Sequence, residues 1–226
     1  MNREKWIENP KVIHHPEWLK RWRKDPFSVP PIYVEVSPVG SCNHRCTFCS
    51  PGLLGYPKRS LSLEVLSRCF EEMRQIREED PDGLGFKSIQ LAGEGEPALH
   101  KDLAEICGRA RAAGIDVGLL TNGVPWTEGF IQEVIPLVNG YFQISVDAAR
   151  PETYVKIHKP VGGMKEWTLL WRNIERMVRA KEASNADCDI GINMTLLVQE
   201  VLEEDGTVIP ANWREMEEYE KIARDA

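Results

Sequence analysis

Five short apolar runs rich in β-branched residues alternate with helical patterns along this 226-residue chain. No other feature constrains the fold as strongly. The runs cover residues 32–36, 87–92, 115–120, 141–146 and 189–198. Strands that alternate with helices pair in parallel, because each helix returns the chain to the start of the next strand. The sequence therefore predicts an α/β fold made of five βα units.

A helical pattern follows each predicted strand, at residues 63–77, 102–113, 128–137, 166–182 and 213–226. The connection after the fourth strand is expected to hold a second, shorter helical piece. Residues 1–29, which include Trp6, Trp18 and Trp22, are expected to form a helical lead-in that packs on the main fold or on a partner. Residues 30–226 then form the core.

Composition limits the class of protein. With 42% hydrophobic and 28% charged residues, the chain can bury the core of one globular domain. A formal net charge of −7 does not support a broad surface for nucleic acid. The first residues lack the apolar core of a signal peptide, and no run reaches the roughly 18 apolar residues of a membrane span. We therefore expect a cytoplasmic protein that binds neither nucleic acid nor a membrane.

Chemically distinctive loops follow four of the predicted strands. A cysteine-rich loop follows the first strand, GEGEP (93–97) the second, TNG (121–123) the third and SVDAAR (145–150) the fourth. The carboxyl ends of parallel strands lie at one edge of the sheet, where the loops converge. These four segments are therefore predicted to share one site.

The loop after the first strand carries Cys42, Cys46 and Cys49 in the spacing C-x3-C-x2-C. Thiolates suit zinc or iron–sulfur clusters, and a four-iron cluster needs four ligands. Three cysteines hold three irons and leave the fourth open, as a catalytic metal keeps a position for its substrate. Structural zinc, with His44 as the fourth ligand, is the alternative, but it leaves the GEGEP loop unexplained.

The cysteine loop, with Phe48 directly before its last cysteine, and the GEGEP loop one strand later resemble the radical S-adenosylmethionine (radical SAM) superfamily over residues 32–198. The resemblance implies a partial (β/α) barrel and a [4Fe-4S] cluster on Cys42, Cys46 and Cys49. It also implies that S-adenosyl-L-methionine binds the open iron. One electron, from a reductant such as flavodoxin or ferredoxin, then cleaves it to methionine and a 5′-deoxyadenosyl radical that abstracts hydrogen from a substrate.

The same resemblance implies contacts to S-adenosylmethionine. Gly95 and Glu96 are assigned to its amino group, and Phe48 to its adenine. Ser145 and Asp147 are assigned to the ribose or the methionine part, because ribose hydroxyls need polar partners and residues two apart share one face of a strand.

Three further residues at strand ends are candidates for cofactor binding. Asn193, on the fifth strand, lies in a segment that loosely resembles the family pattern. Thr121 and Asn122 are candidates for the pocket lining, although TNG also fits a plain turn after a strand.

The segment at 145–159 is similar to the subgroup with C-terminal SPASM/Twitch auxiliary-cluster domains, whose members modify peptides or sugar-like substrates. His158 and Lys159 stand where many relatives carry an arginine. The chain ends at Ala226, before the expected sixth strand and before that domain. We therefore expect either a fragment or a partner that closes the edge of the barrel.

Two other functions fit part of the pattern. One is a metal-stabilised binding or assembly module without turnover. The other is an activase that generates a glycyl radical on a partner protein, which fits the core motif equally well.

Overall fold

The computed structural model describes residues 14–50 and 59–225. Its main sheet has the order β1-β2-β3-β4-β5, and each pair of neighbours is parallel. The strands are β1 Tyr33–Val36, β2 Ser88–Leu91, β3 Asp116–Thr121, β4 Tyr141–Ser145 and β5 Asp189–Asn193. The sheet is open, with β1 and β5 at its edges, so the predicted α/β fold of a partial barrel is confirmed.

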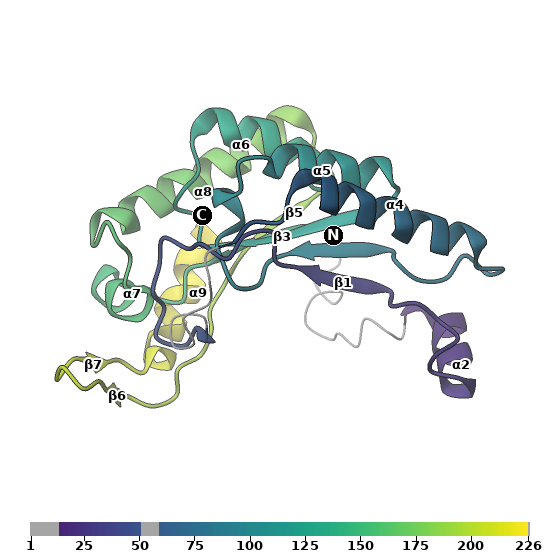
Figure 1. Ribbon diagram of the computed structural model, residues 1–226. Helices are drawn as coiled ribbons and strands as arrows, with labels where there is room; N and C mark the ends of the chain where they lie inside the picture. The colour runs from purple at the N-terminus through teal and green to yellow at the C-terminus, as the bar shows by residue number, and fades with distance from the viewer. Residues whose placement is uncertain (1–13, 51–58, 226) are drawn as a thin grey trace.

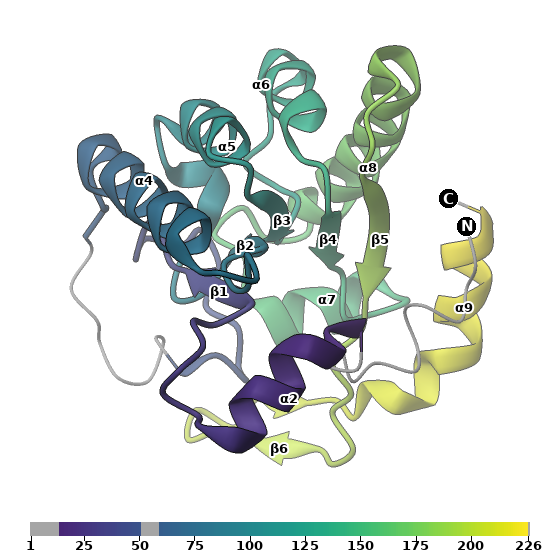
Figure 2. The same ribbon diagram turned by 90° about the vertical axis from the view of Figure 1, so that its right-hand side faces the viewer.

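Helices cover one face of this sheet. The α-helices are α2 Pro16–Lys24, α4 Leu63–Glu79, α5 Leu103–Ala112, α6 Glu128–Val134, α7 Pro151–His158, α8 Lys165–Ser184 and α9 Met216–Asp225. Figure 1 shows α4, α5, α6 and α8 as a layer above the strands, and Figure 2 shows them side by side. Over the residues that the structure describes, no helix is both long and apolar enough to span a membrane.

The two faces of the sheet differ in chemistry because side chains alternate along each strand. Ile89 and Val117 are register partners that lie buried on the helix-covered face. On the opposite face, Gln90 Oε1 accepts hydrogen bonds from the hydroxyls of Tyr33, at 2.5 Å, and Tyr141. The interior of the open barrel is therefore polar, and the hydrophobic core lies between the sheet and the helices.

The fifth strand is shorter than predicted. It ends at Asn193 rather than at residue 198. Beyond Asn193, backbone N–H groups donate to side chains and not to a neighbouring strand. Thr195 N donates to Asp147 Oδ1 at 2.5 Å, and Leu197 N donates to Asn212 Oδ1 at 2.7 Å. The side chains of two distant residues thus replace the sheet as hydrogen-bond partners of this segment.

A small hairpin follows the main sheet and was not predicted. It pairs β6 Val201–Leu202 with β7 Val208–Ile209 in antiparallel register. The acidic residues 203–205 lie in its turn. Lys159 Nζ contacts Glu203 Oε1 at 2.6 Å, which ties the hairpin to the end of α7.

Two predicted helices begin or end differently. The helix predicted at 128–137 divides into α6 and the 3-10 helix η3 Ile135–Leu137, because Pro136 has no N–H to continue the α-helical pattern. The last helix begins as the 3-10 helix η4 Asn212–Glu215 and becomes α9 at Met216.

The lead-in contacts the main fold through α2. Trp18 Nε1 donates to Pro30 O at 2.7 Å, and the rings of Trp18 and Trp22 stack with centroids 6.1 Å apart. Arg21 Nη1 lies 2.8 Å from Asp80 Oδ2, at the residue that caps the C-terminus of α4. These contacts hold α2 against the main fold, whereas Trp6 lies outside the described residues.

Candidate active site

The loops after β1, β2 and β3 meet at the carboxyl edge of the sheet. Glu96 N donates to Ser41 O at 2.9 Å, which joins the GEGEP loop to the cysteine loop. Asn122 Nδ2 donates to Asn43 Oδ1 at 2.7 Å, and Asn122 N donates to Glu96 Oε2 at 2.7 Å. The predicted convergence of these loops is therefore present, and it rests on direct hydrogen bonds between them.

Gly95 lies against the backbone of the cysteine loop. A Cβ atom at this position would lie 2.1 Å from Val39 O and 2.6 Å from Ser41 O, closer than side chains pack. The sequence assigned this glycine to the amino group of S-adenosylmethionine. The structure shows a packing requirement for glycine at this position, because only a residue without a side chain lets the two loops approach this closely.

Glu96 is almost completely buried between these loops. Its carboxylate accepts hydrogen bonds from Thr121 Oγ1 at 2.5 Å, Asn122 N at 2.7 Å and Ala98 N at 3.1 Å. Burial raises the pKa of Glu96 to about 7, and these three donors oppose that rise. A carboxylate accepts up to about four hydrogen bonds, so Glu96 retains capacity for one further donor.

Thr121 and Asn122 hold the turn after β3. Thr121 Oγ1 accepts hydrogen bonds from Trp126 Nε1 at 2.9 Å and from Gly123 N at 3.0 Å. Asn122 Oδ1 accepts from Val124 N at 3.0 Å. Both residues are buried beside the cysteine loop, and most of their polar atoms serve contacts within the protein.

The three loop cysteines are half-buried. Burial raises the pKa of the Cys46 thiol well above its usual range, and the charges of Cys42 and Cys49 raise it further. Burial also raises the pKa of Cys42. These thiols ionise readily only when a cation compensates their charge.

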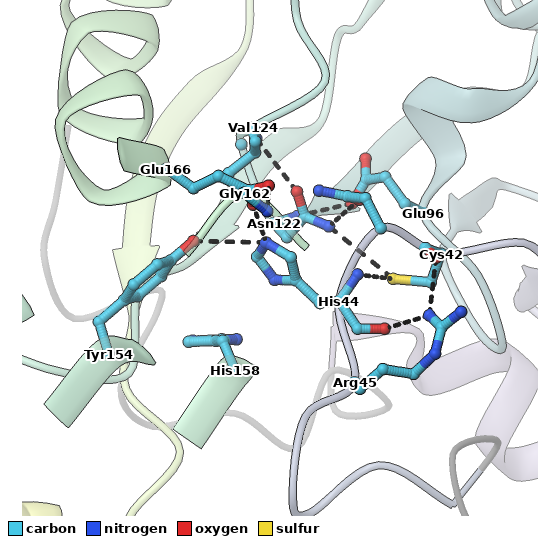
Figure 3. A network of polar contacts seen from close by, with 12 residues as sticks. Cys42, His44, Arg45, Glu96, Asn122, Val124, Tyr154, His158, Gly162 and Glu166 are labelled. Atoms are coloured by element: carbon cyan, nitrogen blue, oxygen red, sulfur yellow. Dashed lines mark hydrogen bonds and ion pairs between the residues drawn. The ribbon is translucent and has the colours of Figure 1, made fainter. Parts of the chain in front are cut away.

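Two histidines lie beside Cys46. His158, at the end of α7, places Nδ1 3.1 Å from Cys46 Sγ. His44 Nε2 lies 2.9 Å from Glu166 Oε2, and Figure 3 shows its ring between the Glu166 carboxylate and His158. Burial and the charge of His158 lower the pKa of His44 to about 3. The contact to Glu166 is therefore a hydrogen bond donated by a neutral imidazole.

Ser145 and Asn193 lie side by side at the ends of β4 and β5, where they are register partners. Asn193 Oδ1 is buried and has no hydrogen-bond partner among the described residues. Asp147 lies beyond the end of β4 with a φ of 56°, so the alternation that placed it on the face of Ser145 does not apply. Its side chain is fully buried, and Oδ1 accepts from Thr195 N.

Phe48 is 40% exposed. Its ring meets the His158 ring edge-on, with centroids 6.0 Å apart. The expected adenine contact stays a prediction.

The contacts of His158 and Glu166 were not predicted from the sequence. His158 was noted as a substitute for an arginine, and the structure places its Nδ1 3.1 Å from Cys46 Sγ. Glu166 carried no signal, since its partner His44 is 122 positions away. A histidine within the cysteine motif was the one hint that this loop has further polar partners.

The residues present fit the cofactors that the sequence suggested. Three thiols on one loop form a soft donor set. A [4Fe-4S] cluster binds each thiolate to a different iron, so the three sulfur atoms need not meet at one point. Asn193 Oδ1, which has no hydrogen-bond partner in the described part of the chain, is an acceptor that a ligand amine or hydroxyl can satisfy.

The model of the radical SAM superfamily matches residues 36–205, which include all three cysteines, the GEGEP loop and β2 to β5.

Curated relatives share part of their length with this chain. PqqA peptide cyclase of Rhizobium meliloti is 29% identical over 139 residues, which are 61% of this chain and 35% of the relative. GTP 3′,8-cyclase of Thermodesulfovibrio yellowstonii is 39% identical over 103 residues, which are 45% of this chain and 30% of the relative. The chain thus spans about a third of the length of these two proteins.

Solved structures share the fold. Streptococcus suis SuiB bound to the precursor peptide SuiA superposes with a TM-score of 0.53 and 16% identity, over 85% of this chain and 40% of that chain. At this identity, the likeness concerns the architecture alone.

Proposed function

Because this chain belongs to the radical SAM superfamily, we propose that it forms the core of an enzyme that reductively cleaves S-adenosylmethionine. The family uses a [4Fe-4S] cluster and S-adenosylmethionine. When bound, these cofactors supply a 5′-deoxyadenosyl radical for hydrogen abstraction. The three cysteines of one loop carry the proposal, since three thiolates leave one corner of a four-iron cluster for S-adenosylmethionine.

In this proposal the chain binds the cluster and S-adenosylmethionine and orients them. Cys42, Cys46 and Cys49 hold the cluster at the carboxyl edge of the sheet. Gly95 and Glu96 fix the cysteine loop, and Glu96 keeps one acceptor position for the ammonium group of S-adenosylmethionine. The exposed face of Phe48 is proposed to meet the adenine ring.

The ends of β4 and β5 are the proposed site of the ribose and the methionine part. Ser145 and Asn193 lie next to each other there, and the buried Asn193 Oδ1 lacks a protein partner among the described residues. Asp147 acts by holding the segment after β5 through Thr195. A hydrogen bond from a ligand to Asn193 would offset the cost of its buried acceptor.

We place the substrate among peptides or sugar-like molecules. A peptide is favoured by the name of the relative PqqA peptide cyclase and by the precursor peptide bound to SuiB, which shares this fold. A protein reductant such as flavodoxin or ferredoxin is proposed to supply the electron. A segment or partner that covers the open edge at β5 would complete the barrel.

The test is an anaerobic assay on the chain reconstituted with iron and sulfide. After reduction with dithionite, S-adenosylmethionine is added and 5′-deoxyadenosine is measured by chromatography. We expect product in the wild type and in Cys69→Ala, whose half-buried cysteine lies on α4. Cys42→Ala, Cys46→Ala and Cys49→Ala should each lose the cluster and all product. A full cluster without cleavage would contradict the proposed activity, and tightly bound zinc without a cluster would favour the binding module.

A further inference from the structure

A second set of metal-binding atoms overlaps the cysteine loop. One ring nitrogen of His44, one of His158 and Cys46 Sγ all lie within 4.8 Å of one another. Both histidines are buried, and Cys46 is half-buried. Cys42 and Cys49 do not belong to this set. The atoms come from the cysteine loop and from the end of α7, so tertiary structure brings them together.

The His44 ring has one nitrogen that forms no hydrogen bond with any residue that the structure describes. Nε2 donates to Glu166 Oε2 at 2.9 Å and lies 3.4 Å from the Tyr154 hydroxyl. Since Nε2 carries the hydrogen, Nδ1 presents a lone pair. That Nδ1 is buried and has no hydrogen-bond partner among residues 14–50 and 59–225. A buried polar atom without a partner destabilises the fold, and a bound cation would satisfy it.

The His158 ring is oriented in the same way. Its Nε2 lies 3.2 Å from Val146 O and 3.2 Å from Asp147 Oδ2, and both of these are acceptors. Nε2 therefore carries the hydrogen here as well. The lone pair on Nδ1 faces Cys46 Sγ at 3.1 Å.

The hydrogen-bond partners of the two rings are those expected at a metal site. Histidines that bind a metal usually donate their other N–H to a carboxylate or a carbonyl, which fixes the ring and its tautomer. Glu166 has this position behind His44, and Val146 O with Asp147 has it behind His158. Two imidazole nitrogens and one thiolate are a donor set that suits zinc and its neighbours among the divalent transition metals.

We propose that His44, Cys46 and His158 form a mononuclear site for Zn²⁺ or a similar divalent transition metal, filled when the chain carries no cluster. Binding displaces the proton of the Cys46 thiol. Because Cys46 is also a proposed cluster ligand, the single ion and the cluster exclude each other. Zinc at this site would then block cluster assembly.

Co²⁺ is the probe, because its visible and near-ultraviolet absorption reports both the geometry and a bond to sulfur. The full chain is purified without metal under anaerobic conditions and titrated with Co²⁺. We expect one ion per chain, with a sulfur-to-cobalt charge-transfer band. The Cys42→Ala/Cys49→Ala double variant should keep this band and the affinity. His44→Gln and His158→Gln should each weaken binding by at least about tenfold.

The reverse pattern would overturn the proposal. If the double cysteine variant loses Co²⁺ while the histidine variants keep it, the ion is bound by the three cysteines. X-ray absorption of the zinc-loaded wild type tests the site without any variant, in case a buried histidine cannot be replaced. Two nitrogen ligands and one sulfur support the site, and three sulfur ligands contradict it.

The same variants distinguish the proposed mononuclear metal site from the proposed [4Fe-4S] cluster. His44→Gln and His158→Gln retain all three cysteines and should still assemble a [4Fe-4S] cluster, measured by iron content and by its visible absorption. The Cys42→Ala/Cys49→Ala variant should not. Failure of cluster assembly in the wild type would count against the enzyme and would leave the Co²⁺ result unaffected.

Discussion

The backbone amide of Asn122 donates a hydrogen bond to Glu96 Oε2 at 2.7 Å, and this bond joins the loop after β2 to the loop after β3. The same carboxylate accepts from Thr121 Oγ1, while Glu96 N donates to Ser41 O in the cysteine loop. One acidic residue therefore connects three loops that come from different βα units. The shape of the site depends on it before any cofactor binds.

The stability of the fold should depend on pH through Glu96. Burial raises the pKa of Glu96 to about 7 from its ordinary value of 4.5, so the folded chain holds this proton more tightly than the unfolded chain. The stabilisation is fully present below pH 4.5 and is lost as pH rises through 7. Its size is roughly 3 kcal/mol. Urea unfolding at a series of pH values from 5 to 8 measures it.

Glu96→Gln should remove this part of the pH dependence, because an amide does not titrate in this range. Glu94→Gln is the matched control, since Glu94 lies two positions earlier in the same loop and is exposed. The control should follow the wild type at every pH. A Glu96→Gln chain that still loses stability as steeply as the control would show that another group titrates.

Gly95→Ala should destabilise the chain and disturb the cysteine loop. The new methyl group would lie 2.1 Å from Val39 O, and a backbone carbonyl cannot move aside as a flexible side chain can. Forcing extra volume into a packed site costs about 1–3 kcal/mol. We expect a lower midpoint of thermal unfolding and a lower iron content after reconstitution.

Gly108→Ala is the opposite case and serves as the control. Gly108 lies inside α5, and an added Cβ there meets no atom within 4 Å. Alanine favours a helix interior over glycine by about 1 kcal/mol, so this variant should be more stable than the wild type and keep its full iron content. Equal effects of the two substitutions would mean that the loops do not need the contact at Gly95.

Sequence patterns predicted the sheet well because each strand carries a local signal. The runs at 87–92 and 115–120 contain the buried residues Ile89 and Val117, and their β-branched side chains fit a strand between two others. The end of β5 had no such signal. It depends on Asp147 and Asn212, which bind the backbone of residues 195–197 from other parts of the chain.

The candidate site was predictable as a set of loops but not as a network of contacts. The spacing of Cys42, Cys46 and Cys49 is visible in the sequence, and so is its place after a strand. The reason for Gly95 is not visible, since the carbonyl that excludes a side chain belongs to Val39. Such pairs of distant residues are set by packing, which no local pattern records.

Two substitutions of Asp147 should distinguish the contribution of its hydrogen bond to stability from the contribution of its charge. Asp147 Oδ1 accepts from Thr195 N inside the protein, and asparagine at this position can accept the same bond. Asparagine also tolerates the left-handed backbone, with its φ of 56°. Asp147→Ala leaves a donor unsatisfied and should cost about 1–3 kcal/mol in the free energy of unfolding. Asp147→Asn should cost clearly less, and equal losses would assign the role to the charge.

Asn193→Ala should weaken S-adenosylmethionine binding without weakening the fold. The neighbours of Asn193 bind its backbone carbonyl, which Tyr219 contacts at 2.7 Å, so the side chain is free to change. Removing a buried acceptor that lacks a partner should raise the free energy of unfolding of the metal-free chain by up to about 1 kcal/mol. The reconstituted chain should keep its iron and lose about tenfold in affinity for the cofactor, measured by calorimetry.

Asp189→Asn, at the start of the same strand, should change neither the stability nor the affinity. If Asn193→Ala lowers stability and leaves the affinity unchanged, this residue supports the fold and does not contact the cofactor.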